Sequence, residues 1–417
     1  MIYTKYFFGL LIALILTIGA GCEFDNTPTA TDPRDEGKPT PEIVSMDPPE
    51  GWYAGIPKMV INGNNFSEVT ENNVVFFNEE LGTVLDASET ELHVQPPANV
   101  LGDSITIRVA VHGAPRFSNE VQYPIRAAVE PVPQISPAFE RAWGVTTDRD
   151  GNLYVSIQEA AASGGTIKIY PDGTREEYIP PRIVKYDNMA FDDEGYMYLA
   201  RNIRLIARVP PGGGQEENWM PLPVGVNIFD LAFDQYGYLW AVGNNENVYR
   251  VDTNAEEYTP IEFDANARSV RYYNGYLYIS ASMREDDGYN IYRAEVSPDG
   301  SLSDFSTYFN FSEAYTKPDA VPMAIAFSEN GTLYLGMRGG PDGILQVYPD
   351  GSWESLYPKL IIPDNLPSGR TPDFISFAWG NDTNLYATRD RVTVDGEVRV
   401  RQVLLRINTL EQGAPLQ

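Results

Sequence analysis

The stretch Asn188-Met-Ala-Phe-Asp-Asp-Glu-Gly-Tyr-Met-Tyr198 decides the fold, because the chain carries its pattern six times between Trp143 and the C-terminus. Each copy holds an apolar segment, a short acidic or glycine turn, and a second segment that reaches an aromatic residue. The other copies begin at Gly144, Asp230, Ser269, Ala324 and Ile375, and their aromatic residues are Tyr154, Trp240, Tyr278, Tyr334 and Tyr386. Strand-built copies about 40 residues apart can bury their faces only against their neighbours, so the pattern predicts a six-bladed β-propeller.

Each copy continues into a third strand and, in the plainest cases, a Pro-Asp-Gly turn. These turns are Pro171–Gly173, Pro298–Gly300 and Pro349–Gly351. Proline presets φ at the first corner and glycine accepts a positive φ, so each turn reverses the chain into a fourth strand. The last copy has a third strand at 403–408 but too little chain for a fourth. We therefore expect residues 127–135 to supply it and to close the propeller, which spans residues 127–417.

The N-terminus has the features of an export signal. Residues 1–21 carry an early lysine, a short apolar run and small residues before Cys22, which is the only cysteine of the chain. This order is typical of a secretory signal. It also resembles the lipobox of bacterial lipoproteins, and that resemblance implies lipid on Cys22. Residues 22–40 are polar and contain proline, so they predict a flexible tether.

The start of the tether bears on where the protein would be displayed. Glu23 and Asp25 follow Cys22 closely. They resemble the export tag of surface lipoproteins in some Gram-negative bacteria, although ordinary linker charges remain the alternative. We expect an exported protein, anchored by lipid to the outer membrane or cell surface of a Gram-negative bacterium.

Residues 41–126 alternate apolar and polar side chains in short segments separated by Gly, Pro and Asn turns, as a small β-sandwich does. The opening Pro41-Glu-Ile-Val-Ser-Met-Asp-Pro-Pro-Glu-Gly51, the later Ile61-Asn-Gly63 and the closing Leu92-His-Val-Gln-Pro-Pro97 resemble the IPT/TIG family of immunoglobulin-like domains. That resemblance implies a spacer or docking module. The fold class is therefore all-β, with an Ig-like sandwich ahead of the propeller.

Charge excludes one class of partner. The chain has 58 acidic and 30 basic residues, a formal net charge of -28. Such a field repels the phosphate backbone, so we expect no nucleic-acid partner.

The candidate binding site lies on one rim of the propeller. Loops that lead into first strands and loops that join second to third strands share this rim, which we call the loop rim, and they carry the long insertions of the sequence. Binding residues concentrate on such loops. The candidate ligand-binding residues are Trp143, Tyr186, Asn188, Arg201, Asp230, Arg268, Arg284, Arg338, Asp373 and Arg389. Arginine forks beside aromatic rings suit carboxylates, uronic sugars or a peptide terminus. The open alternative is that each arginine pairs with a nearby loop aspartate.

A metal-dependent site is the second hypothesis. Phrases such as Asn188-Met-Ala-Phe-Asp and Pro372-Asp-Phe resemble NHL-type and gluconolactonase/regucalcin-like six-bladed propellers. That resemblance implies a calcium ion held by Glu140, Asn188 and Asp373, which would activate water in a lactonase or other hydrolase. The family's Glu-Gly-Pro is absent, because the chain reads Glu140-Arg-Ala. No Ser-His-Asp set, P-loop or dinucleotide motif is present either.

These observations favour a surface lipoprotein whose propeller binds a glycan or protein ligand, without catalysis and without a cofactor. The IPT/TIG-like domain would act as spacer or docking module. The alternatives are the calcium-dependent lactonase or hydrolase, and a structural accessory of an outer-membrane assembly such as a transporter complex.

Overall fold

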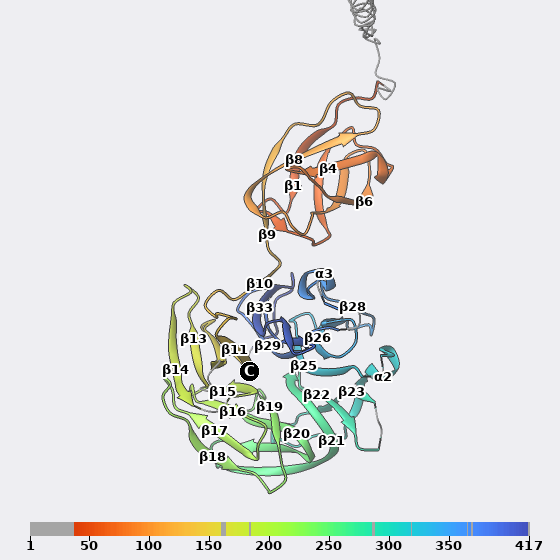
Figure 1. Ribbon diagram of the computed structural model, residues 1–417. Helices are drawn as coiled ribbons and strands as arrows, with labels where there is room; N and C mark the ends of the chain where they lie inside the picture. Colours follow the sequence, from red (N-terminus) through yellow and green to blue (C-terminus); the bar gives the residue numbers. More distant parts are fainter. Residues whose placement is uncertain are drawn as a thin grey trace, which may run out of the picture. The chain divides into compact units, whose positions relative to one another are not determined.

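The computed structural model describes residues 37–159, 164–182, 185–285, 288–317, 319–364, 366–367 and 370–415. The chain divides into two compact units, one ending at Arg126 and one beginning at Ala127 (Figure 1). The predicted signal peptide, Cys22 and the tether up to residue 36 lie outside the described residues. Within the described ranges, no helix is long and apolar enough to cross a bilayer.

The first unit is a β-sandwich, as the alternating sequence predicts. One sheet has the order β1 (Glu42–Asp47), β3 (Met59–Asn64), β7 (Glu91–Gln95), β6 (Thr83–Ala87). The other has the order β2 (Trp52–Tyr53), β9 (Val121–Arg126), β8 (Gly102–Val111), β4 (Asn73–Phe77), β5 (Glu80–Leu81), and the 3-10 helix η1 (Thr70–Asn72) precedes β4. Alternate residues of β3 and β8, such as Ile61 and Ile107, are fully buried and join one core. The period of two thus places one face of each sheet inside the sandwich.

Three of the sequence repeats form separate four-stranded antiparallel sheets, the blades. The first is β11 (Glu140–Thr147), β12 (Leu153–Glu159), β13 (Gly164–Ile169) and β14 (Arg175–Arg182). The second is β15 (Asn188–Phe191), β16 (Met197–Ala200), β17 (Leu205–Val209) and β18 (Glu217–Pro221). The fifth is β25 (Val321–Phe327), β26 (Leu333–Arg338), β27 (Ile344–Val347) and β28 (Trp353–Ser355).

The third and fourth repeats share one six-stranded sheet. Its strands are β19 (Ile228–Phe233), β20 (Tyr238–Asp252), β21 (Glu257–Tyr273), β22 (Tyr276–Met283), β23 (Tyr289–Glu295) and β24 (Ser306–Phe309). The long β20 pairs with β19 and then with β21, and β21 continues into its pairing with β22. Two blades are therefore continuous through these long strands.

The last blade takes a strand from each end of the propeller unit. It contains β29 (Phe374–Trp379), β30 (Asn384–Arg389), β33 (Val403–Asn408) and β10 (Val129–Pro131), and Val129 of β10 lies opposite Ile407 of β33. The strand falls inside the 127–135 segment from which the sequence predicts a closing strand. The first strands contact one another in a closed cycle, from β11 through β15, β19, β21, β25 and β29 back to β11 (Figure 1). Closure removes the exposed edges of an open sheet.

The insertions contribute small elements of their own. Two short helices, α2 (Phe311–Ala314) and α3 (Pro358–Ile361), precede the first strands of the last two blades. A small hairpin of β31 (Val392–Val394) and β32 (Glu397–Val400) follows β30.

A turn aspartate anchors the aromatic residue of the second strand in the first three blades. The pairs are Asp148 with the Tyr154 hydroxyl (2.9 Å), Asp192 with the Tyr198 hydroxyl (3.0 Å) and Asp234 with Trp240 Nε1 (2.8 Å). In the fifth blade Ser328 replaces the aspartate, and Glu411 of the C-terminal segment accepts from the Tyr334 hydroxyl instead (3.2 Å). These aromatic side chains are buried in blade cores, so they do not form a binding stripe.

Candidate functional site

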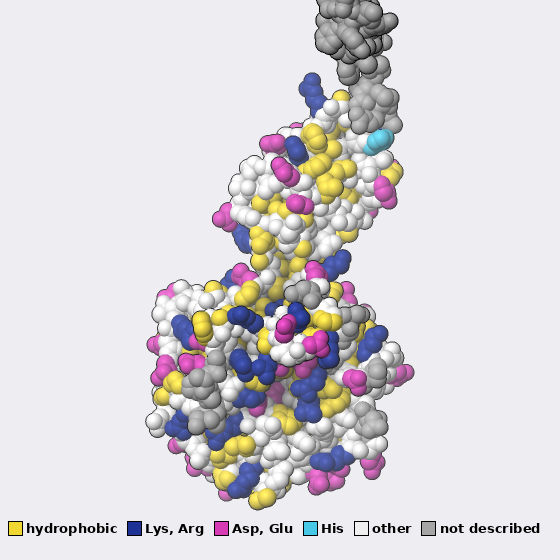
Figure 2. Space-filling view, viewed as in Figure 1, with side chains coloured by type: hydrophobic (Ala, Val, Ile, Leu, Met, Phe, Trp, Pro, Cys, Tyr) yellow, Lys and Arg dark blue, Asp and Glu magenta, His cyan; other side chains and the backbone are white. Residues whose placement is uncertain are grey.

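Topology brings the predicted arginines to the loop rim. Arg201 and Arg284 follow β16 and β22, Arg338 and Arg389 end β26 and β30, and Arg268 lies where β21 enters the fourth blade. The turns between first and second strands form the opposite end, which we call the turn rim. Figure 2 shows Lys and Arg side chains gathered around the middle of the propeller unit in that view.

Three of these five arginines have a carboxylate partner. Arg201 Nη1 lies 3.3 Å from Glu216 Oε1, Arg338 Nε lies 2.9 Å from Asp373 Oδ2, and Arg284 forms an ion pair with Asp264. For these three arginines, the structure therefore shows the alternative in which each arginine pairs with a nearby acid. Burial raises the pKa of Asp373 in spite of Arg338 beside it.

Arg268 and Arg389 have no carboxylate partner among the described residues. Arg268 donates from Nε to the Tyr289 hydroxyl (3.2 Å), and its guanidinium lies 5.1 Å from the centre of the Phe229 ring. Arg389 donates from Nη1 to the backbone oxygen of Ile361 (3.1 Å). Burial lowers the pKa of Arg389. Both guanidinium groups keep donors for a further acceptor, since each has five N–H groups.

The two aromatic candidates of the loop rim, Trp143 and Tyr186, differ in burial and in their contacts within the protein. The Lys185 ammonium lies 3.4 Å from the centre of the half-buried Trp143 ring, a cation–π contact. Tyr186 is buried, with 1% of its surface exposed, and its hydroxyl donates to Glu216. Glu216 therefore forms an ion pair with Arg201 and accepts a hydrogen bond from Tyr186, and burial raises the pKa of Glu216. Trp143 is therefore partly exposed, whereas Tyr186 is buried and holds Glu216.

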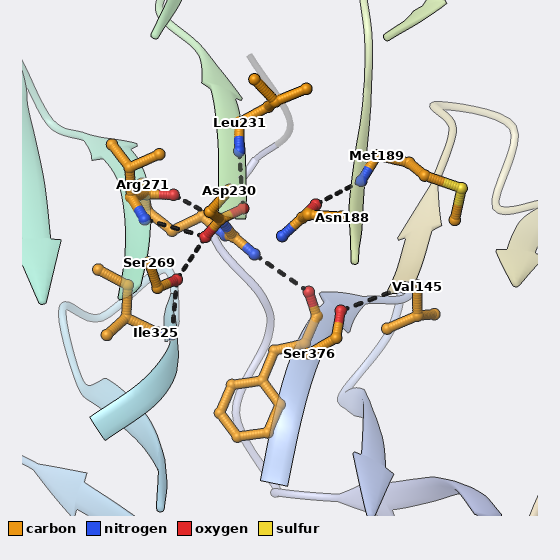
Figure 3. Close-up of polar contacts among 11 residues, drawn as sticks. Val145, Asn188, Met189, Asp230, Leu231, Ser269, Arg271, Ile325 and Ser376 are labelled. Carbon is orange, nitrogen blue, oxygen red and sulfur yellow. Dashed lines mark hydrogen bonds and ion pairs between the residues drawn. The ribbon is translucent and has the colours of Figure 1, made fainter. Parts of the chain in front are cut away.

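Asn188 and Asp230 lie inside the propeller. Asn188 Oδ1 accepts from the backbone N–H of Met189 (2.6 Å). Asp230 is 2% exposed and accepts hydrogen bonds from Leu231 N (2.8 Å), Ser269 Oγ (2.5 Å), Val270 N (2.9 Å) and Arg271 Nη1 (2.8 Å) (Figure 3). The carboxylate of Asp230 therefore joins the third blade to the fourth.

The three residues of the calcium hypothesis have separate partners. Glu140 pairs with Arg175 (2.5 Å), Asn188 with the adjacent backbone and Asp373 with Arg338. In the described part of the chain, no group of three or more His, Cys, Asp or Glu side chains is placed to hold a metal ion. Each of these residues thus has a side-chain oxygen that accepts from a donor within the protein.

A cavity of about 460 Å³ lies around the axis, between the first strands and the turn rim; we call it the axial cavity. One residue of each first strand lines it at the same register, namely Thr146, Ala190, Ala232, Arg271, Ala326 and Ala378. The lining also includes the turn residues Asp150 and Asp193, which are exposed.

Arg271 is the residue that the predicted site omits. Its Nη1 also donates to Val270 O (2.5 Å), and its Nη2 lies 3.4 Å from Phe377 O in the last blade. A signal for it exists in the repeats, because this position holds a small residue in the five other copies and an arginine in the fourth. The five small side chains at this position leave space around the axis. The long side chain of Arg271 occupies part of that space, and the cavity is the remainder.

Comparison with solved structures finds proteins of similar fold. The described fold is similar to that of an auxiliary nutrient binding protein from Bacteroides thetaiotaomicron, at 14% identity and a TM-score of 0.51, covering 89% of this chain and 98% of that one. A protein of unknown function from the same organism has 14% identity and a TM-score of 0.49, covering 90% of this chain and 99% of that one. Virginiamycin B lyase from Staphylococcus aureus has 14% identity and a TM-score of 0.43, covering 65% and 86%.

Sequence comparison reaches the first unit only. No curated protein matches the chain in sequence. Residues 41–125 match the IPT/TIG domain model. The described part of the chain therefore contains an IPT/TIG domain followed by a β-propeller.

Proposed function

We propose that the propeller is a ligand-binding head, which recognises a carboxylate-bearing glycan or protein at the loop rim. The IPT/TIG domain serves as spacer or docking module, and lipid on Cys22 holds the protein at the outer membrane or cell surface. The similar Bacteroides thetaiotaomicron protein is an auxiliary nutrient binding protein. Nutrient capture beside an outer-membrane transporter is the form of this function that we propose for the present chain.

The observation that carries the proposal is the pair of uncompensated arginines, Arg268 and Arg389. In a chain of net charge -28, the expected neighbour of an arginine is a carboxylate, and the other three rim arginines have one. Among the described residues Arg268 and Arg389 are held by a phenol and by a backbone oxygen. A ligand carboxylate would supply the missing charge through a forked contact, with Phe229 and Trp143 as apolar neighbours.

The two sources of a carboxylate are distinguished by binding to arrays. Uronic-acid glycans are compared with their methyl esters, and peptides with a free C-terminus are compared with C-terminal amides. Loss of binding on esterification identifies a glycan ligand, and loss on amidation identifies a peptide ligand. Binding that ignores both changes contradicts recognition of a carboxylate.

Substitutions then place the ligand on the rim. A charged hydrogen bond contributes about 1.5–3 kcal/mol, so Arg268→Ala is expected to weaken binding roughly 10-fold to 100-fold. Arg284→Ala is the matched control, because Arg284 lies on the same rim but is paired with Asp264. Equal affinities of the two variants would remove Arg268 from the site. Arg389→Gln, with its melting temperature recorded because Arg389 is half-buried, tests the second arginine.

A further inference from the structure

We infer that the axial cavity is a second binding site, which takes a small organic carboxylate anchored by Arg271. The inference goes beyond the loop-rim function and does not depend on it. Most of the lining lies between the register of Arg271 and the turn rim, and Asn188 is the one member of the predicted loop-rim set that lines the cavity. Arg268 and Arg389, which carry the loop-rim proposal, do not line it. Its volume of about 460 Å³ falls in the range of small-molecule sites, about 300–1,000 Å³.

Donor capacity is the first argument. The guanidinium of Arg271 has five N–H groups, and its contacts to Asp230, Val270 and Phe377 account for three hydrogen bonds. The contact to Phe377 O is long, at 3.4 Å, and Nε has no partner among the described residues. The side chain is 21% exposed, so the remaining donors can reach the cavity.

Of the carboxylates that line the cavity, Asp148, Asp192 and Asp193 already have donors, whereas Asp150 is exposed at the turn rim. Asp230 is surrounded by four donors, as described above. Asp148 accepts from the backbone of Asp150 and Asn152 and from the Tyr154 hydroxyl, and Asp193 pairs with Arg149 (2.5 Å). Two other cations line the cavity, but Arg149 pairs with Asp193 and the Lys168 ammonium lies over the rings of Tyr154 and Tyr170. The fork of Arg271 is therefore the anchoring group among the first strands.

The walls define the rest of the ligand. Alanine side chains and the rings of Phe327 and Phe377 line the cavity, which suits an apolar or ring-shaped body. Tyr272 also lines it, and burial raises the pKa of Tyr272 to about 12. Its hydroxyl therefore stays protonated at neutral pH and adds no charge that would repel an anion. A carboxylate on a small ring combines both requirements.

The competing explanation is that Arg271 only ties the third, fourth and last blades together. Ala190→Leu distinguishes these explanations, because Ala190 lines the cavity from β15, whose blade holds none of the hydrogen-bond partners of Arg271. Arg271→Gln removes the charge directly. Arg268→Ala, on the loop rim, is the control that separates this site from the proposed function.

The test uses the whole mature chain and calorimetric titration with benzoate and galacturonate, each compared with a neutral partner, benzyl alcohol and galactose. We expect at least one carboxylate to bind with a Kd of about 1 mM or tighter, and its neutral partner roughly 10-fold more weakly. Ala190→Leu and Arg271→Gln should each weaken binding at least about 10-fold, and Arg268→Ala should leave it unchanged.

The inference is overturned if neither carboxylate binds at millimolar concentration, or if binding survives Ala190→Leu. A loss caused by Arg268→Ala alone would also overturn it, since that result assigns the carboxylate to the loop rim. Should Arg271→Gln fail to fold, Ala190→Leu decides the outcome, provided that its melting temperature stays near that of the parent protein.

Discussion

Arg271 Nη1 lies 2.8 Å from Oδ2 of the buried Asp230, so an ion pair links β21 to β19 at the axis of the propeller. Asp230 is 3% exposed in its side chain and Arg271 is 21% exposed. The guanidinium continues toward Phe377 O in β29, on a blade that is not adjacent in sequence (Figure 3). One arginine thus connects three blades, two of which share the six-stranded sheet.

Breaking this pair from the acid side should be costly. Asp230→Ala leaves Arg271 without its counter-ion and frees the N–H of Val270, so we expect the free energy of unfolding to fall by about 3–5 kcal/mol. Urea unfolding followed by tryptophan fluorescence measures the change. The exposed pair of Arg284 with Asp264 is the control, because Arg284→Ala should cost at most about 1 kcal/mol. If the two variants lost similar amounts of unfolding free energy, the axial pair would contribute no more than an exposed ion pair does.

The turn aspartates should stabilise the blades through their aromatic partners. In the second blade Asp192 Oδ2 accepts from the Tyr198 hydroxyl at 3.0 Å, and Tyr198 is 1% exposed. A double-mutant cycle of Asp192→Ala and Tyr198→Phe should give a coupling energy of about 1–3 kcal/mol, as expected for a hydrogen bond to a charged group. Thr90→Ala combined with Tyr198→Phe, in separate units, should give no coupling. Additive losses in the first cycle would contradict the pairing.

Asp234 should make the stability of the third blade depend on pH. Burial raises its folded-state pKa, although Trp240 and turn N–H groups donate to it. The folded protein therefore holds this proton more tightly than the unfolded chain, and stability falls as pH rises from the unfolded pKa through the folded one. The melting temperature of the parent protein relative to Asp234→Asn should decrease as the pH rises from about 4, the usual pKa of an aspartate, toward neutrality. A constant difference across this range would contradict the raised pKa.

The C-terminal segment should be sensitive to one added methyl group. A Cβ at Gly413 would lie 2.4 Å from Cγ of Trp379, closer than non-bonded atoms can approach. Gly413→Ala should therefore displace the segment from Trp379 and cost about 1–3 kcal/mol, the usual range for overpacking. A shift in tryptophan emission, compared with Ala414→Ser, reports the displacement. Unchanged emission and unchanged stability would mean that the segment does not pack there.

The repeats allowed most of the fold to be predicted, because a strand pairing with its sequence neighbour depends on local pattern alone. Asn188-Met-Ala-Phe-Asp and its copies place the first and second strands in the structure. The contact of Glu411 with Tyr334 could not be predicted in this way, since it joins the last blade's tail to another blade over a long sequence separation. Local pattern does not encode such a contact.

The candidate site was predictable only as a set of positions. Topology places Arg268, Arg338 and Arg389 on one rim, but side-chain packing decides that Arg338 meets Asp373 while Arg268 lies over Phe229. Arg271 could have been identified by aligning the six copies and looking for the position at which one copy differs from the others in size and charge. The predicted site followed the long loops, and the axial cavity is lined by strands and short turns.

Closure of the propeller yields the last prediction. Val132 follows β10, is 4% exposed, and donates from its backbone nitrogen to Leu404 O at 2.9 Å. Val132→Pro removes this donor, and because Pro131 and Pro133 already lack one, the outer strand would retain few bonds to β33. We expect a loss of about 3 kcal/mol or more in the free energy of unfolding and, through the exposed edge of β33, faster aggregation on heating. Scattering during a thermal ramp measures this, with Pro133→Ala as control, since Pro133 is exposed. If Val132→Pro melts and scatters like the parent protein, β10 does not hold the ring closed.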